Sequence, residues 1–144
     1  MPRIEFHFNA PALVPYACRL LRKVNQHGLR AQVVGLPTTL GQLDQMLWTF
    51  SPLDFLPHCG PSSSPAMREA SRFLLTEQPV PGWAAGVLVN LGEHLPEGFE
   101  AFERVIEVVS VDDLHRAQAR ERWRAYTARG HRLVRHDLAK AGAE

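Results

Sequence analysis

Three arginines and a tryptophan stand at helical spacing in the last third of the chain. Arg116, Arg120 and Arg124 occupy every fourth position, and an α-helix, which turns about 100° per residue, would place them on one face. Trp123 lies about 20° around the axis from Arg116, so an indole borders the arginines. Guanidinium groups suit carboxylates, and the indole with nearby Val109 can hold a hydrophobic side chain. The set is typical either of a receptor for an acidic peptide with an aromatic end or of a solvated helix face.

Two further aromatic residues, Trp48 and Phe55, stand where a predicted helix gives way to a proline-rich turn. Large aromatic side chains usually pack in a core. A helix end beside a turn is also a place where interface anchors occur. From the residues alone, both interpretations stay open: core packing or a second docking surface.

The patterns of common catalytic and cofactor sites are absent from the sequence. Residues 9–15, after the first predicted strand, contain no glycine that would let the backbone approach a pyrophosphate. No serine lies in a G-x-S-x-G turn. His58 and Cys59 are adjacent but lack a second ligand pair at metal-binding spacing, and the other histidines are scattered. We therefore predict no catalytic residue, no cofactor and no metal, and a nucleotide-binding α/β enzyme is a distant alternative.

The composition is that of an ordinary globular protein. The chain has 144 residues, 45% of them hydrophobic and 22% charged, with a net charge of +1. A general nucleic-acid binder usually carries a large basic excess, although the arginines could still bind single-stranded DNA directly, with Trp123 stacking on a base. Acidic residues dominate positions 93–113 and arginines dominate positions 116–135. This sharp boundary favours a docking face.

Cysteine content and hydropathy bear on the compartment. The chain has two cysteines, and its first ten residues lack the apolar run of a signal peptide. No apolar stretch approaches the roughly 20 residues that span a bilayer. We expect a cytoplasmic protein with no membrane contact.

The helix that carries the arginines should run from Leu114 to Gly130. Asp112 is the predicted N-cap, and Gly130 should end the helix in the left-handed conformation. Its small residues, which share a separate face, are predicted to pack against a sheet. They are Leu114, Ala117, Ala125 and Ala128.

The rest of the chain alternates between strand and helix patterns. Strands are predicted over 3–8, 29–36, 73–76, 85–91 and 105–109. Helices are predicted from a cap at Asn9 to about residue 26, from 38 or 39 to 48, and, as a short element, over 97–103. Residues 59–66 should form a loop, and residues 131–144 a helical turn or a loosely ordered tail. The pattern predicts one α/β domain over 1–144: three Rossmann-like layers, a mostly parallel sheet flanked by helices, and a long basic C-terminal helix.

Two blocks of the sequence resemble a known family. The segments LDQMLWTFSPLDFLPH, residues 43–58, and ARERWRAY, residues 119–126, are similar to the most recognisable blocks of the chi subunit of bacterial DNA polymerase III. The order of elements and the chain length also agree, whereas residues 59–84 match weakly. The resemblance implies a Rossmann-like fold without a nucleotide, in a noncatalytic accessory subunit of the clamp-loader complex.

The resemblance also implies partners. Members of the family pair one-to-one with the psi subunit and reach the clamp loader through it. They bind the acidic C-terminal tail of single-stranded-DNA-binding protein, so their contact with DNA is indirect. Some members also pair with an iron–sulfur DNA-repair helicase through the surface used for psi.

Matched by motif, the tail-binding positions of the family fall on five residues of this chain. They are Val109, Arg116, Arg120, Trp123 and Arg124. Trp123 stands where the family often has tyrosine, and Arg116 and Arg124 where it has lysines, which keeps a ring and two cations. The psi-facing positions fall on Trp48 and Phe55. The family match leaves open whether Arg132 and Arg135 extend the basic face.

Overall fold

Seven parallel strands form one sheet in the computed structural model of the chain, which describes residues 2–49 and 56–139. The strands are β1 (Arg3–Ala10), β2 (Ala31–Val34), β3 (His58–Cys59), β4 (Phe73–Thr76), β5 (Val87–Asn90), β6 (Arg104–Ser110) and β7 (Leu133–Asp137). Their order across the sheet is β3-β4-β2-β5-β6-β1-β7. Every neighbouring pair is parallel. The predicted α/β class is confirmed, with a sheet that is wholly rather than mostly parallel.

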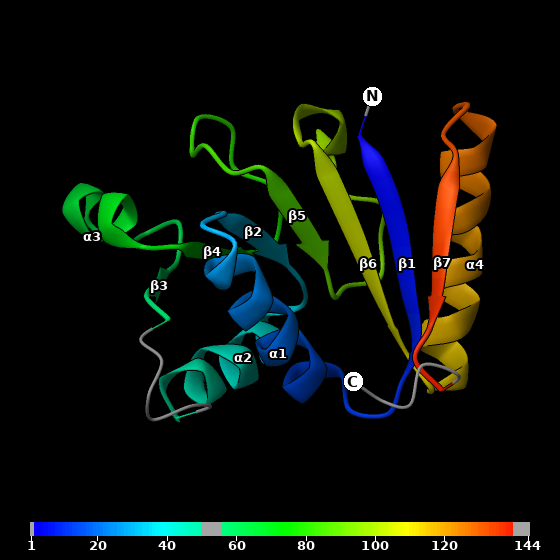
Figure 1. Cartoon of the computed structure of the whole chain (residues 1–144), viewed down its shortest axis with the longest axis horizontal. Helices are drawn as coiled ribbons and strands as arrows, with labels where there is room; N and C mark the ends of the chain where they lie inside the picture. Colours follow the sequence, from blue (N-terminus) through cyan, green and yellow to red (C-terminus); the bar gives the residue numbers. More distant parts are fainter. Residues whose placement is uncertain (1, 50–55, 140–144) are drawn as a thin grey trace.

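Helices cover both faces of this sheet (Figure 1). They are α1 (Leu13–Gln26), α2 (Pro37–Thr49), α3 (Pro65–Ala70), the 3₁₀ turn η1 (Phe99–Ala101) and α4 (Asp113–Ala128). One core cluster packs α1 and α2 against the sheet through residues such as Leu21, Leu43 and Val33. A second cluster joins α4 and η1 to the other face through Tyr126 and Phe99. The three-layer arrangement therefore follows from apolar side chains on both faces of buried strands.

The segment predicted to be a helical turn or loose tail instead forms strand β7. It pairs with β1, with Ile4 opposite Leu133 and His7 opposite His136. The chain reverses after α4 at Gly130, whose φ of 85° fits the predicted left-handed end of the helix. The first strand of the sequence thus lies between two strands from the last third of the chain. Because this pairing is entirely long-range, a local pattern could not indicate it.

The predicted loop over 59–66 also contains regular structure. Strand β3 pairs His58 and Cys59 with β4, and α3 begins at Pro65. Ser64 caps α3, since its hydroxyl accepts a hydrogen bond from the Met67 amide at 3.2 Å. A serine followed by proline at the first helical position is a known helix start. The signal is present in the sequence, but the glycine, serines and prolines around it favour a loop, and the loop prediction is wrong for β3 and the start of α3.

Asn9 does not cap α1 as predicted. It is a strand residue with φ of 64°, and Ala12 occupies the N-cap position without a side-chain hydrogen bond. The Asn9 amide instead contacts α4 and β7, as described below. None of the helices in residues 2–49 and 56–139 combines the length and apolarity needed to cross a membrane.

Candidate functional site

A groove of about 690 Å³ lies between α4 and β7, above the α4 face of β1. Strand alternation directs Phe6 and Phe8 of β1 to this face, where Val109 of β6 joins them. Helix α4 supplies most of the polar lining. The groove residues are Phe6, Phe8, Asn9, Val109, Arg116, Ala119, Arg120, Trp123, Arg124 and Arg135. All five residues that the family motif predicted for tail binding therefore line one groove.

The arginines of α4 differ in their partners. The Arg116 Nη2 donates a 2.7 Å hydrogen bond to Asn9 Oδ1, a neutral acceptor that leaves the cation uncompensated. Arg124 forms an exposed ion pair with Glu121 on the next turn of the same helix. Arg120 is exposed and makes neither a hydrogen bond nor an ion pair within the described part of the chain. The groove therefore presents net positive charge, with Arg120 at its centre free to meet a carboxylate.

Trp123 forms an aromatic wall of the groove. Its ring packs edge-on against Phe6, with 5.0 Å between ring centroids, and the residue is only partly buried. The indole thus packs against the core on one side, while part of its surface stays accessible. This placement suits a wall for a hydrophobic side chain next to the cations.

Arg135 is a groove residue that the sequence left undecided. Its guanidinium lies 5.1 Å from the Phe8 ring centroid and 5.9 Å from that of Trp123, within the range of a cation–π contact. It reaches the groove only because β7 pairs with β1. Residues 133–137 do not alternate between apolar and polar side chains, since Leu133 and Val134 precede three polar residues, so the sequence carried no clear strand signal for β7.

The packing face predicted for α4 is wrong. Leu114 is 64% exposed, Ala117 and Ala128 are also exposed, and Ala125 is only partly buried. The helix instead buries Ala119, Arg122 and Tyr126. The prediction failed because the buried face of α4 is not made of small apolar residues alone but includes Arg122, which pairs with a buried carboxylate.

A buried carboxylate, Glu107, explains why α4 turns Arg122 and Tyr126 towards the sheet. The Arg122 Nε donates to Glu107 Oε1 at 2.8 Å, and the Tyr126 hydroxyl donates to Glu107 Oε2 at 2.7 Å. The Asn90 amide donates to the same carboxylate. Burial and the Glu107 charge both raise the pKa of Tyr126, so its hydroxyl keeps its proton. This network orients α4 and leaves the Arg116 side of the helix to the groove.

The second predicted surface is described only in part. Trp48 is 59% exposed at the end of α2, so the core interpretation does not hold for it. Its ring lies 4.7 Å from the ring of His58. That imidazole is held by the Leu56 carbonyl at 2.9 Å and by Asp44 at 2.9 Å. Phe55 lies outside the described residues. Trp48 is thus an exposed aromatic residue that packs against an imidazole held by two hydrogen bonds.

A smaller hollow lies at the carboxyl ends of β2 and β5, where open α/β sheets commonly bind ligands. Gly35 and Gly92 line it together with Glu77 and Glu93. Carboxylates at this edge would repel the phosphates of a nucleotide. The groove beside α4 is therefore a better candidate for a binding site than this hollow.

Comparisons with known proteins agree with the motif resemblance. The sequence profile of the family described as DNA polymerase III chi subunit, HolC, matches residues 1–134. A relative from Pseudomonas aeruginosa, named DNA polymerase III subunit chi, is 30% identical over 145 aligned positions. The alignment covers 97% of this chain and 99% of that protein. The family profile therefore covers Trp48 and the groove residues up to Arg124, and it ends within β7, before Arg135.

Proposed function

The chain belongs to the DNA polymerase III chi subunit family, and from this membership we propose that its α4 groove binds the acidic C-terminal tail of single-stranded-DNA-binding protein. Membership makes the chain an accessory component of DNA replication, associated with DNA polymerase III. The tail would tether the polymerase assembly to protein-coated template, and the chain itself would carry out no catalytic step. We expect it to act in the cytoplasm, where bacterial replication takes place.

The unpaired Arg120 beside Trp123 is the observation that carries this proposal. A chain end offers a carboxylate for a guanidinium fork. A terminal phenylalanine would enter beside the indole, above Phe8 and Val109, and aspartates would meet Arg116. Hydrogen bonds to charged groups contribute about 1.5–3 kcal/mol each, and solvent screening reduces this at an exposed site. An affinity in the micromolar range, about −8 kcal/mol, is expected for one tail.

Weak single contacts suit a tether. Many copies of the tail lie close together on protein-coated DNA, so a released chain would quickly meet another tail. The tether could then follow the moving polymerase without holding it at one place.

Peptide titration tests the groove. A fluorescent peptide with the acidic tail and a terminal phenylalanine is titrated with wild type, Arg120→Ala and Lys23→Ala, and binding is followed by anisotropy. We expect Arg120→Ala to weaken binding about tenfold, or about 1.4 kcal/mol. Lys23→Ala removes a cation from exposed α1, away from the groove, and should bind as wild type does.

Two controls give the result its meaning. Amidation of the peptide's terminal carboxylate should weaken wild-type binding as much as Arg120→Ala does, because it removes the partner of the same contact. Unchanged affinity of Arg120→Ala for the free-acid peptide would contradict the proposal. Tight binding of a naked oligonucleotide that the peptide cannot displace would instead favour the direct DNA-binding alternative.

We propose that the surface around Trp48 pairs with the psi subunit, through which the chain reaches the clamp loader. Its support is an exposed indole that rests on a hydrogen-bonded His58. Exposed tryptophans are frequent interface anchors. Trp48→Ala should abolish co-purification with psi while tail-peptide affinity stays the same. Retained pairing would exclude Trp48 as the anchor. The family's helicase partner would compete for this surface.

A further inference from the structure

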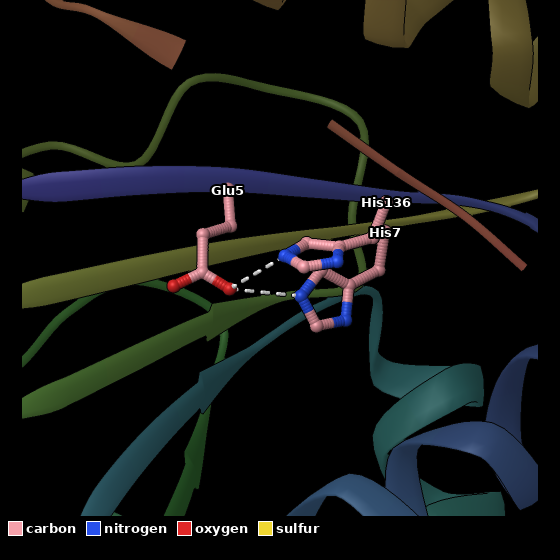
Figure 2. Close-up of side chains that lie close together, drawn as sticks. All are labelled: Glu5, His7 and His136. Atoms are coloured by element: carbon pink, nitrogen blue, oxygen red, sulfur yellow. Dashed lines mark hydrogen bonds and ion pairs between the residues drawn. The ribbon is translucent and has the colours of Figure 1, made fainter. Parts of the chain in front are cut away.

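Three potential metal ligands meet on the face of the sheet opposite the groove. Glu5 and His7 of β1 point to the face that α1 covers, since Phe6 and Phe8, which alternate with them along the strand, point to the α4 face. His136 of β7 lies opposite His7 in the strand register. Figure 2 shows the two imidazoles directed at one carboxylate oxygen of Glu5. The histidines that the sequence placed far apart are therefore neighbours.

We propose that Glu5, His7 and His136 form a Zn²⁺ site between β1 and β7. Zn²⁺ binds imidazole nitrogens and carboxylate oxygens at about 2.0–2.2 Å, so two ligand atoms of a tetrahedral site lie about 3.3–3.5 Å apart. Glu5 Oε1 lies 3.0 Å from His7 Nε2 and 3.5 Å from His136 Nε2. All three ligand atoms lie within 4.8 Å of one another. A small rotation of the exposed His136 ring would complete the three-ligand set and leave a fourth position for water.

The inner two ligands are already oriented by hydrogen bonds. The Tyr16 hydroxyl lies 2.6 Å from His7 Nδ1, which leaves Nε2 as the ligand atom when the Nδ1 proton is donated to that hydroxyl. Such outer partners are typical of metal-binding histidines. The Glu5 carboxylate is likewise held in place by its hydrogen bonds with His7 and Arg104.

Two arginines oppose a cation at this position. The Arg104 Nε donates to Glu5 Oε2 at 2.7 Å, and its Nη2 lies 3.0 Å from Oε1. Arg3 approaches Oε2 at 3.1 Å. The Nη2 contact falls on Oε1, the proposed ligand oxygen, so an ion there would compete with Arg104, and both arginines lower the affinity of the site for Zn²⁺. We therefore expect micromolar binding, and tighter binding once the exposed Arg3 is removed.

The proposed ion would stabilise the pairing of the edge strand β7 with β1. β7 has one partner strand, β1, and it carries His136 on one face and Arg135 on the other. An ion held between β1 and β7 would therefore stabilise the strand that forms a wall of the groove. This consequence is independent of which ligand the groove receives.

Metal titration of the full chain, without a histidine tag and after chelator treatment, tests the site. Calorimetry with Zn²⁺ should give one ion per chain for wild type. Co²⁺ should give the visible absorption of a tetrahedral complex. His136→Ala should weaken binding by more than the 10–100-fold that loss of an outer partner usually causes. His94→Ala, which removes another exposed histidine, should bind as wild type does.

The outcomes are decisive in either direction. One ion per chain, lost in His136→Ala, retained in His94→Ala and bound more tightly by Arg3→Ala, supports the site. Absence of binding at millimolar Zn²⁺ overturns it, since the residues would then form only an ion-pair cluster. Equal affinity of wild type and His136→Ala also overturns it. Because His136 is exposed on an edge strand, its replacement should leave the circular dichroism spectrum unchanged.

Discussion

Two arginines of α4, only two positions apart, have opposite environments. Arg122 is 3% exposed and forms a hydrogen-bonded ion pair with the fully buried Glu107. Arg120 is exposed in the groove and has no ionic partner in the described part of the chain. Two positions correspond to about 200° of helical rotation, so the two side chains point in nearly opposite directions. The same residue type thus fixes the helix on one side and is available to a partner on the other.

Replacement of Arg122 should have the largest effect, a loss of folding stability. In Arg122→Ala, the Glu107 carboxylate would remain in the interior without its cation, and removing one partner of a buried ion pair typically destabilises a protein by about 3–5 kcal/mol. Urea unfolding followed by circular dichroism measures the loss. Arg120→Ala is the matched variant and should change stability by no more than about 0.5 kcal/mol. Equal destabilisation by both substitutions would contradict the division of roles.

A second buried carboxylate, Glu5, sharpens the comparison, because both of its arginine partners, Arg3 and Arg104, are partly exposed to solvent. Glu5 has its pKa lowered to about 2 from the ordinary 4.5 by hydrogen bonds from His7 and Arg104 that overcome burial. Its contribution to stability is therefore complete above pH 4.5 and is lost as the pH falls towards 2. The contribution is on the order of 3 kcal/mol. Glu5→Gln should flatten the dependence of unfolding free energy on pH in this range. An unchanged acid profile would show that Glu5 is not a stabilising group.

Arg135 tests whether the groove needs β7. Its guanidinium lies near the rings of Phe8 and Trp123, and it is exposed. Arg135→Ala should weaken binding of the tail peptide by about threefold, or about 0.6 kcal/mol, because solvent screening limits the attraction of an exposed charge. Peptide anisotropy measures the change, and 0.5 M salt should reduce the difference between the two proteins. If Arg135→Ala bound the peptide with wild-type affinity, β7 would not contribute to the peptide-binding site.

Replacement of Arg124 should have the smallest effect on peptide binding. Its charge is already met by Glu121 in an exposed ion pair. Arg124→Ala should therefore weaken peptide binding less than twofold, whereas Glu121→Ala should strengthen it slightly by freeing the guanidinium. Calorimetry of the two variants with the same peptide distinguishes these changes by sign. A loss in Arg124→Ala as large as in Arg120→Ala would show that Glu121 does not compete for the cation.

Local signals sufficed for much of the fold. The strand over 73–76 lies where it was predicted, and α1 ends at Gln26 as predicted. Asp112 caps α4, its carboxylate accepting from the His115 amide at 3.0 Å. These features depend on neighbouring residues: apolar runs, a capping side chain and a left-handed glycine. The groove residues of α4 were likewise predictable, since helical spacing alone places them on one face.

Features that depend on distant pairing were missed. Strand β7 exists because β1 offers it a hydrogen-bonding edge, and the juxtaposition of Glu5 with His136 follows from that pairing. The inward turn of Arg122 requires a carboxylate on β6 that local periodicity cannot reveal. In each case a polar residue acquires its environment from a segment far along the chain.

The position of β1 has a consequence for synthesis of the chain. The first strand to leave the ribosome pairs with β6, about a hundred residues later, and with β7, which is later still. Until those segments emerge, Phe6 and Phe8 have no stable partners on either side. The nascent chain must therefore expose this strand throughout most of translation, and closure of the sheet around it should be among the last and slowest folding steps.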